Sequence, residues 1–253
     1  MSLMRMMRLL LAALLGLALT TTAYAARPPR QKHVLLYTQT TGYRHASIEP
    51  GSAAIIEMGK RQHISIVRSE DPNVFSTARL KGYDAIIFLS TTTDPKKPES
   101  EWFQGERRTA LQNFVHRGGG IVGIHGASDS HYHWPWYQQL IGAHFLRHPQ
   151  GTPMGVISVL DRTHRSTAGL PAKIKRSDEW YYFDDYNPEM HLLITVDPQS
   201  IGQEDVNPNP VSWTQNFEGA RVFYTAMGHT DESYSDEYIM KHIFGGLNWV
   251  LKR

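Results

Sequence analysis

Short apolar runs alternate with helical patterns along the first half of the chain, and this alternation predicts its fold. Mainly apolar runs over residues 34–38, 64–67, 84–89 and 121–124 are typical of strands covered on both faces. Apolar residues at helical spacing occupy residues 50–62 and 99–117. Strands that alternate with helices in this order predict an α/β fold with a doubly wound, mostly parallel sheet.

The second half of the chain is richer in strand-like segments. We expect strands over residues 156–160, 192–196 and 221–226, and an edge strand over residues 211–213 after a Pro-rich loop. We also expect a short helix over residues 138–145 and a last helix over residues 235–251. Neither an internal repeat nor a linker divides the sequence, so we predict a single domain over residues 26–253.

Residues 1–25 have the pattern of a secretory signal peptide. Arg5 and Arg8 precede an apolar segment over residues 9–19, which is too short to span a bilayer. Ala23-Tyr24-Ala25 is a typical cleavage site, so the mature chain would begin at Ala26. An uncleaved anchor is the alternative, but no stop-transfer flank follows. We therefore predict a periplasmic or secreted protein without a stable membrane anchor after cleavage.

Charge and cysteine content narrow the function classes. Removing the first 25 residues removes two arginines and no acid, so the formal net charge falls from +2 to 0. No Lys/Arg-rich run is present, so nucleic acid is not an expected partner. The chain has no cysteine, which excludes disulfides, a thiolate nucleophile and thiolate metal ligands.

The segment over residues 118–129 carries the most distinctive local pattern. Three glycines end a helical pattern, a buried strand follows, and Gly123-Ile124-His125-Gly126-Ala127 then has the spacing of a nucleophile elbow. Histidine stands where Ser or Cys would be the nucleophile, and Ser128 lies outside that position. The alternative is a glycine-rich turn that holds a histidine by chance. Ligands in open α/β sheets bind beyond the carboxyl ends of the strands, where His125 is expected.

Two other histidines follow predicted strands in the same way. His45 comes after the first strand and His229 after a late one, and strand ends of a parallel sheet meet at one edge. With a carboxylate from Glu179, or from neighbouring Asp178 or Asp129, such histidines suit acid–base chemistry or a divalent metal such as zinc. The alternative for each histidine is a hydrogen-bonded structural role in a loop. No phosphate-binding glycine motif is present.

Aromatic residues gather in the polar segments of the second half and have two interpretations. They could form a wall that stacks on sugar rings, because aromatic faces pack on C–H surfaces. They could equally belong to the core or to a subunit interface of a homo-oligomer. The residues concerned are Trp134, Trp136, Tyr137, Trp180 and Tyr181.

In the order of these and other short segments, the chain resembles the ThuA-like (trehalose utilisation) family. The matching segments, in order, are residues 42–45, 118–127, 135–137, 142–145, 148–149, 178–181, 210–213, 219–229 and 245–249. The resemblance implies a flavodoxin-like fold related to class I glutamine amidotransferases, in which the elbow carries a catalytic cysteine. Here the elbow position is His125, so the scaffold is implied without the amidotransferase reaction. The family is associated with sugar catabolism, but trehalose itself does not follow as the substrate.

Our principal hypothesis is an exported carbohydrate-active enzyme, a hydrolase or lyase, that acts on a sugar or an oxidised glycoside. A non-catalytic carbohydrate-binding protein and an interaction module are the alternatives. We expect the catalytic residues to be His125, Glu179 and His229. We expect the substrate to contact Tyr43, Arg44, His45, Asp129, Trp136, Trp180 and Tyr181. A metal, if one is bound, would take its ligands from His45, His125, Glu179 and His229.

Overall fold

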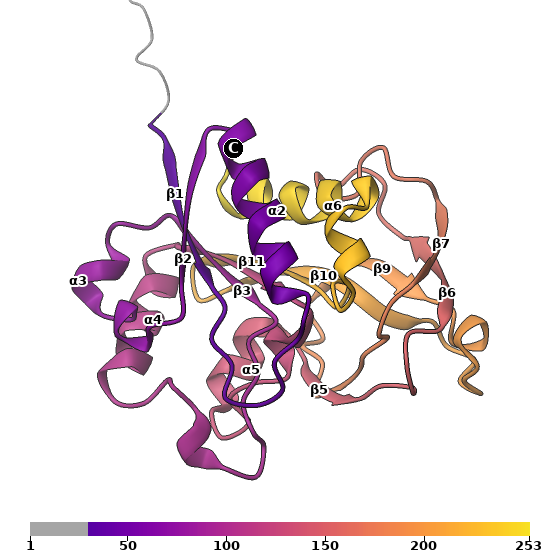
Figure 1. Ribbon diagram of the computed structural model, residues 1–253, viewed down its shortest axis with the longest axis horizontal. Coiled ribbons are helices and arrows are strands. Elements are labelled where there is room, and N and C mark those ends of the chain that lie inside the picture. The colour runs from indigo at the N-terminus through magenta and orange to yellow at the C-terminus, as the bar shows by residue number, and fades with distance from the viewer. Residues whose placement is uncertain (1–29) are drawn as a thin grey trace, which may run out of the picture. The chain divides into compact units, whose positions relative to one another are not determined.

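A nine-stranded sheet organises the described part of the chain, residues 30–253, in this computed structural model (Figure 1). The order of its strands is β2-β1-β3-β4-β11-β10-β9-β6-β7. The strands are β1 (Lys32–Tyr37), β2 (Ile64–Ser69), β3 (Ala85–Leu89), β4 (Gly120–Ile124), β6 (Met154–Val159), β7 (Lys173–Ser177), β9 (His191–Val196), β10 (Asn209–Phe217) and β11 (Ala220–Thr225). The predicted signal peptide, residues 1–25, lies outside the described residues.

The first five strands of that order are parallel, as the apolar runs predict. β1 pairs with β2 and β3, and β4 lies between β3 and β11, all in parallel register. Every residue of β3 and β4 is buried, which is why these strands lack alternation in the sequence. The carboxyl ends of β1, β4 and β11 therefore meet at one edge of the sheet.

Helices cover both faces of the parallel strands, and two glycines of β4 show how closely the helices pack against the sheet. The helices are α2 (Ile48–Arg61), α3 (Thr77–Leu80), α4 (Glu106–His116), α5 (Pro135–Ile141) and α6 (Glu237–Val250). A Cβ on Gly120 would lie 2.8 Å from the side chain of Val250 in α6, whereas Gly123 faces Ile141 of α5. Positions three apart point to opposite faces of a strand, so α5 and α6 cover opposite faces of the sheet. The α/β fold expected from the sequence is confirmed.

An antiparallel extension completes the sheet and corrects one prediction. β10, β9, β6 and β7 continue from β11, each antiparallel to its neighbour. The predicted edge strand over residues 211–213 is wrong, because β10 is an internal strand of nine residues. Pro210, which suggests an edge, is accommodated where the β10–β9 register shifts between Pro210 and Ser212.

Two helix boundaries also differ from the prediction. The helix expected over residues 99–117 begins at Glu106, after a 3-10 turn at Pro98–Ser100. The helix expected over residues 138–145 is α5, which ends at Gly142 with a left-handed φ of 102°. The chain then forms β5 (His144–Arg147), which pairs with β8 (Tyr182–Asp184) in a separate two-stranded sheet. Among the described residues, no helix has the length and apolar character needed to cross a membrane.

Candidate functional site

His125 lies at the sharp turn that leaves β4. The turn is a 3-10 helix, His125–Ser128, and His125 has a left-handed φ of 49°, which is uncommon for a residue other than glycine. Its ring is fully buried, and Nδ1 lies 2.8 Å from the carbonyl oxygen of Ala226. Because a carbonyl only accepts, Nδ1 carries the proton and Nε2 presents a lone pair. The turn therefore directs one unprotonated nitrogen towards the carboxyl edge of the sheet.

His45 approaches that nitrogen from the loop after β1. Its Nε2 lies 3.1 Å from Nε2 of His125, and its side chain is almost fully buried. Burial, together with the charges of His125 and His229, lowers the pKa of His45 to about 2, so the ring is neutral. Nδ1 of His45 is buried and has no hydrogen-bond partner among the described residues. The close approach requires Gly126, because a Cβ there would lie 3.3 Å from the His45 ring.

Glu179 and His229 complete the cluster. His229 follows β11, and its Nδ1 lies 3.2 Å from Nε2 of His125 and 3.1 Å from Oε2 of Glu179. The same Oε2 lies 3.4 Å from Nε2 of His125. The hydrogen bond to Glu179 raises the pKa of His229. Burial alone would raise the pKa of Glu179, but its contacts with His125 and His229 hold that pKa below its ordinary range.

Four side chains from separate parts of the chain thus converge. One ligand-type atom from each of His45, His125, Glu179 and His229 lies within 4.8 Å of all the others. Three of these residues follow the parallel strands β1, β4 and β11, and Glu179 lies two residues beyond β7. The arrangement can hold a metal ion or exchange protons, because imidazole and carboxylate groups do both.

A pocket of about 340 Å³ opens over the cluster. Its volume lies in the range of small-molecule sites, roughly 300–1,000 Å³. The lining residues are Tyr43, His45, Asp129, Phe145, His148, Glu179, Tyr181 and His229. Two of them were not expected from the sequence: Phe145, and His148, whose Nδ1 lies 3.3 Å from Oε1 of Glu179. Both belong to or follow β5, a strand that no local pattern predicts. The signal that could have found them is the match of residues 142–145 and 148–149 to the family pattern.

Asp129 contributes a second carboxylate to this pocket. The hydroxyl of Tyr132 donates a hydrogen bond to Oδ1 of Asp129. Burial raises the pKa of Asp129 to about 7, although the bond from Tyr132 acts in the opposite direction. A carboxyl group with a pKa close to neutrality can both accept and donate a proton at physiological pH. The pocket therefore holds two acids with different protonation behaviour.

Three predicted substrate contacts do not line the pocket. Trp180 is buried, with Nε1 donating to the carbonyl oxygen of Pro153 at 2.9 Å. Trp136 stacks on Trp134 and donates to Glu218. Arg44 forms two ion pairs of 2.9 Å, with Glu49 and Glu70, on the outside of the β1 loop.

These positions correct the predicted aromatic wall. Trp134, Tyr137 and Trp180 have little exposed surface, so for them the alternative interpretation as core residues is the right one. Tyr181 is the one member of the predicted wall that lines the pocket. Its ring packs 4.4 Å from that of His125, so it supports the cluster from the side.

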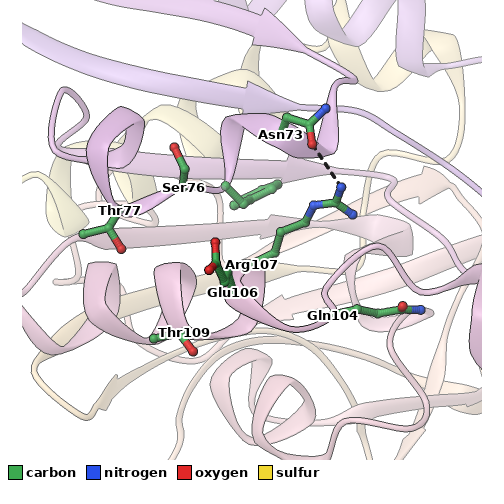
Figure 2. A pocket seen from close by; sticks show the side chains of 8 residues that line it. Asn73, Ser76, Thr77, Gln104, Glu106, Arg107 and Thr109 are labelled. Carbon is green, nitrogen blue, oxygen red and sulfur yellow. Dashed lines mark hydrogen bonds between the residues drawn. The ribbon is translucent and has the colours of Figure 1, made fainter.

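A larger hollow lies elsewhere, between the turn after β2 and the start of α4 (Figure 2). Its volume is about 680 Å³. The cation of Arg107 is engaged there, donating to Asn73 at 3.0 Å (Figure 2). It also donates to the carbonyl oxygen of Trp102 at 3.2 Å. Among the described residues that line this hollow there is no histidine, and Glu106 is the sole carboxylate, so it lacks the paired acid–base groups of the smaller pocket.

Comparisons with known proteins agree with this fold. The family model for ThuA, described as trehalose utilisation, matches residues 33–250. A ThuA-like protein from Bacteroides uniformis is 24% identical with a TM-score of 0.72, covering 90% of this chain and 94% of that one. Another from Parabacteroides merdae is 16% identical with a TM-score of 0.69 and coverage of 88% and 90%. A glutamine amidotransferase from Thermotoga maritima is 15% identical with a TM-score of 0.53 and coverage of 88% and 90%. No curated protein sequence matches the chain.

Proposed function

The chain belongs to the ThuA family of trehalose utilisation, and from this premise we propose that it is an exported enzyme of carbohydrate catabolism. Its substrate would be a sugar or an oxidised glycoside bound over the cluster of His45, His125, Glu179 and His229. The observation that carries the proposal is the convergence of these four residues, three of which line one pocket while His125 is buried beside them. Export rests on the signal-like pattern of residues 1–25.

Acid–base chemistry on an oxidised glycoside suits the groups in the pocket. A carbonyl group in the sugar acidifies the neighbouring C–H bond, so a base can remove that proton. The C–O bond at the next carbon then breaks, and the leaving oxygen takes a proton from an acid. His229, with its raised pKa, is the proposed acid, and Glu179, held as a carboxylate, is the proposed base.

The walls of the pocket support a carbohydrate as the ligand. The ring of Tyr43 is 65% exposed, and Phe145 presents further aromatic surface, whereas Tyr181 lines the pocket but is almost fully buried. Aromatic rings pack on the C–H faces of sugars, and Asp129 and His148 offer hydrogen-bond partners for hydroxyl groups. The same features favour the second candidate, a protein that binds a carbohydrate without converting it.

The proposed enzyme differs from a glutamine amidotransferase in its nucleophile. The elbow after β4 carries His125, and the chain has no cysteine to form a thiolate. The reaction we propose needs no nucleophile at that position. The scaffold is therefore shared with glutamine amidotransferases, whereas the proposed chemistry is not.

A ligand screen followed by a turnover assay tests the proposal. The protein without residues 1–25 is heated with sugars and ketosugars, and ligands that raise its melting temperature are incubated with it and their products separated. We expect a ketosugar to stabilise the protein and to be cleaved. Glu179→Gln and His229→Gln should abolish cleavage, whereas His116→Gln, on the exposed surface of α4, should not. Stabilisation without cleavage would favour the binding protein, and neither effect would refute both.

A further inference from the structure

We propose that the floor of this pocket is a divalent metal centre. Its ligands are Nε2 of His45, Nε2 of His125, Nδ1 of His229 and Oε2 of Glu179. The inference rests on the proposed function for the role of the pocket, but it makes Oε2 of Glu179 and Nδ1 of His229 metal ligands in place of the base and the acid proposed for the metal-free site. It is argued from the cluster alone and tested with metal ions alone.

Four of the six separations between these atoms are close to those of ligands around one ion, and the other two, from His45 to His229 and to Glu179, fall within the 4.8 Å bound of the cluster. Zinc binds nitrogen and oxygen ligands at about 2.0–2.2 Å, so in a tetrahedral site neighbouring ligand atoms lie about 3.3–3.5 Å apart. Nε2 of His125 lies 3.1 Å from His45, 3.2 Å from His229 and 3.4 Å from Glu179. Nδ1 of His229 lies 3.1 Å from Oε2 of Glu179. An ion placed between the four atoms would need only small shifts of these side chains.

The four side chains carry too few protons for every one of these contacts to be a hydrogen bond. Nε2 of His125 carries none, because the proton of that ring is on Nδ1, and Oε2 of a carboxylate carries none. His45 and His229 can supply one proton each. Two of the four close contacts therefore bring electron-rich atoms together at 3.1–3.4 Å without a hydrogen between them. A cation would satisfy all four contacts at once.

The groups behind the ligands hold them in place, as the outer shell of a metal site does. Ala226 accepts the Nδ1 proton of His125, which fixes the ring with Nε2 towards the cluster. His148 contacts Oε1 of Glu179 at 3.3 Å, leaving Oε2 for the centre. Asp178 accepts the backbone N–H of His229 at 3.1 Å. Three of the four ligands are thus oriented by a named partner.

The donor set indicates the class of ion. Three imidazole nitrogens with one carboxylate oxygen suit zinc and the neighbouring transition metals, whereas magnesium and calcium prefer oxygen ligands. Four protein ligands fill a tetrahedral zinc site. A catalytic role therefore requires either expansion to a fifth ligand or an ion that takes six, such as manganese. In either case the added position would have to face the pocket that opens over the cluster.

Metal titration of the chelator-treated protein tests the inference. Zn²⁺, Co²⁺ and Mn²⁺ are titrated calorimetrically into the chain lacking residues 1–25, and Co²⁺ binding is followed by visible absorption. We expect one tightly bound Zn²⁺ or Co²⁺ per chain and a rise in melting temperature on binding. Glu179→Gln and His125→Gln should each weaken binding at least 100-fold and change the Co²⁺ spectrum. The matched control His116→Gln, which also removes an imidazole paired with a carboxylate, should bind as the wild type does.

The outcomes separate this inference from the proposed function. Absence of stoichiometric binding, or equal affinity in Glu179→Gln and wild type, would overturn the metal centre. Cleavage of a ketosugar by metal-free protein would overturn it as well, while leaving the proposed function intact. If the protein binds a metal tightly and the screen finds no sugar that binds, the metal centre is supported and the carbohydrate substrate is contradicted. Circular dichroism of each variant checks that the fold is kept, which matters most for His125→Gln because His125 is fully buried.

Discussion

The carboxylate of Asp178 accepts the backbone N–H of His229 at 3.1 Å, across 51 positions of sequence. Asp178 also accepts the N–H of Gly228 and an Arg176 guanidinium N–H, both at 3.1 Å, and is fully buried. The next residue, Glu179, contacts the ring of His229. Two consecutive acids therefore have different roles, since the first fixes the backbone of the loop after β11 and the second contacts a side chain of that loop.

Replacing Asp178 should destabilise the fold. Asp178→Ala leaves a nearly buried Arg176 without this partner and three backbone N–H groups, of Glu179, Gly228 and His229, without their acceptor, so we expect a loss of about 3–5 kcal/mol. Urea unfolding followed by circular dichroism measures it. Asp205→Ala, which removes an exposed partner of Arg147, should cost less than about 1 kcal/mol. Equal losses in the two variants would show that burial of the first pair has no effect.

His148→Gln should weaken the proposed metal centre without abolishing it. His148 contacts the outer oxygen of Glu179, and the loss of such a partner costs about 10–100-fold in metal affinity. Calorimetric titration with Zn²⁺ measures the affinity, and the Co²⁺ spectrum reports whether Glu179 changes its mode of coordination. His148→Asn, which can place an amide N–H near the same oxygen, should recover part of the loss. Unchanged affinity and spectrum would remove His148 from the site.

The protein should not release ammonia from glutamine. The turn after β4 presents an imidazole instead of a thiolate, and no other cysteine exists to replace it. A coupled assay for glutamate should give the buffer rate for the wild type. Glutamate formation above that rate, lost in His125→Ala, would contradict our interpretation of the elbow.

Stability should fall as the pH drops below about 6.5, and His131 should contribute to the slope. Burial and the charge of Arg108 keep the pKa of His131 well below its usual value, and Nε2 accepts the backbone N–H of Phe103. In the unfolded chain His131 binds a proton as the pH falls below about 6.5, whereas in the folded chain its ring stays neutral. The fold is therefore most stable above that pH and loses stability below it. Each such group changes the slope by at most about 1.4 kcal/mol per pH unit.

Urea unfolding at several pH values between about 4.5 and 8 measures this dependence. His131→Gln should show a shallower decline than the wild type over the acid part of the range. The control His63→Asn, at an exposed position with a left-handed φ that asparagine tolerates, should keep the wild-type slope. Parallel curves for wild type and His131→Gln would show that His131 is not the group responsible.

Export should remove the first 25 residues. The charged, apolar and small-residue regions of a signal peptide occur there in order, so Ala26 is the expected N-terminus. Mass spectrometry of protein recovered from the native host measures it. Ala23→Leu and Ala25→Leu should block cleavage and leave the longer chain. An intact Met1 in the wild-type protein would contradict export by this route.

The sequence predicts the parallel half of the fold well because its strands are buried on both faces. Residues 121–124 form an unbroken apolar run, and they lie in β4 at the middle of the sheet. The antiparallel half is harder to predict, because β7 and β8 alternate exposed and buried residues over only five and three positions. Pro210 suggests an edge strand, whereas a register shift admits it inside the sheet.

The candidate site is also predictable only where its residues follow the parallel strands. His45, His125 and His229 follow parallel strands, so the topology alone indicates that they meet. His148 follows β5, whose pairing with β8 depends on contacts that no local pattern encodes. Trp136 and Trp180 do not line the pocket, because both indoles find partners elsewhere and composition does not tell a binding wall from a core.

The order of the four cluster residues along the chain has a consequence for when the site can exist. β11 fits between β4 and β10, and His229, which follows it, is the last of the four cluster residues along the chain. The strand that carries it pairs with β4, about a hundred positions earlier, so the cluster depends on late, long-range pairing. Before these strands pair, the histidines of a nascent or translocating chain are separate and do not form a metal site. If a metal ion is bound, it is acquired after folding, from the supply in the compartment where the chain folds.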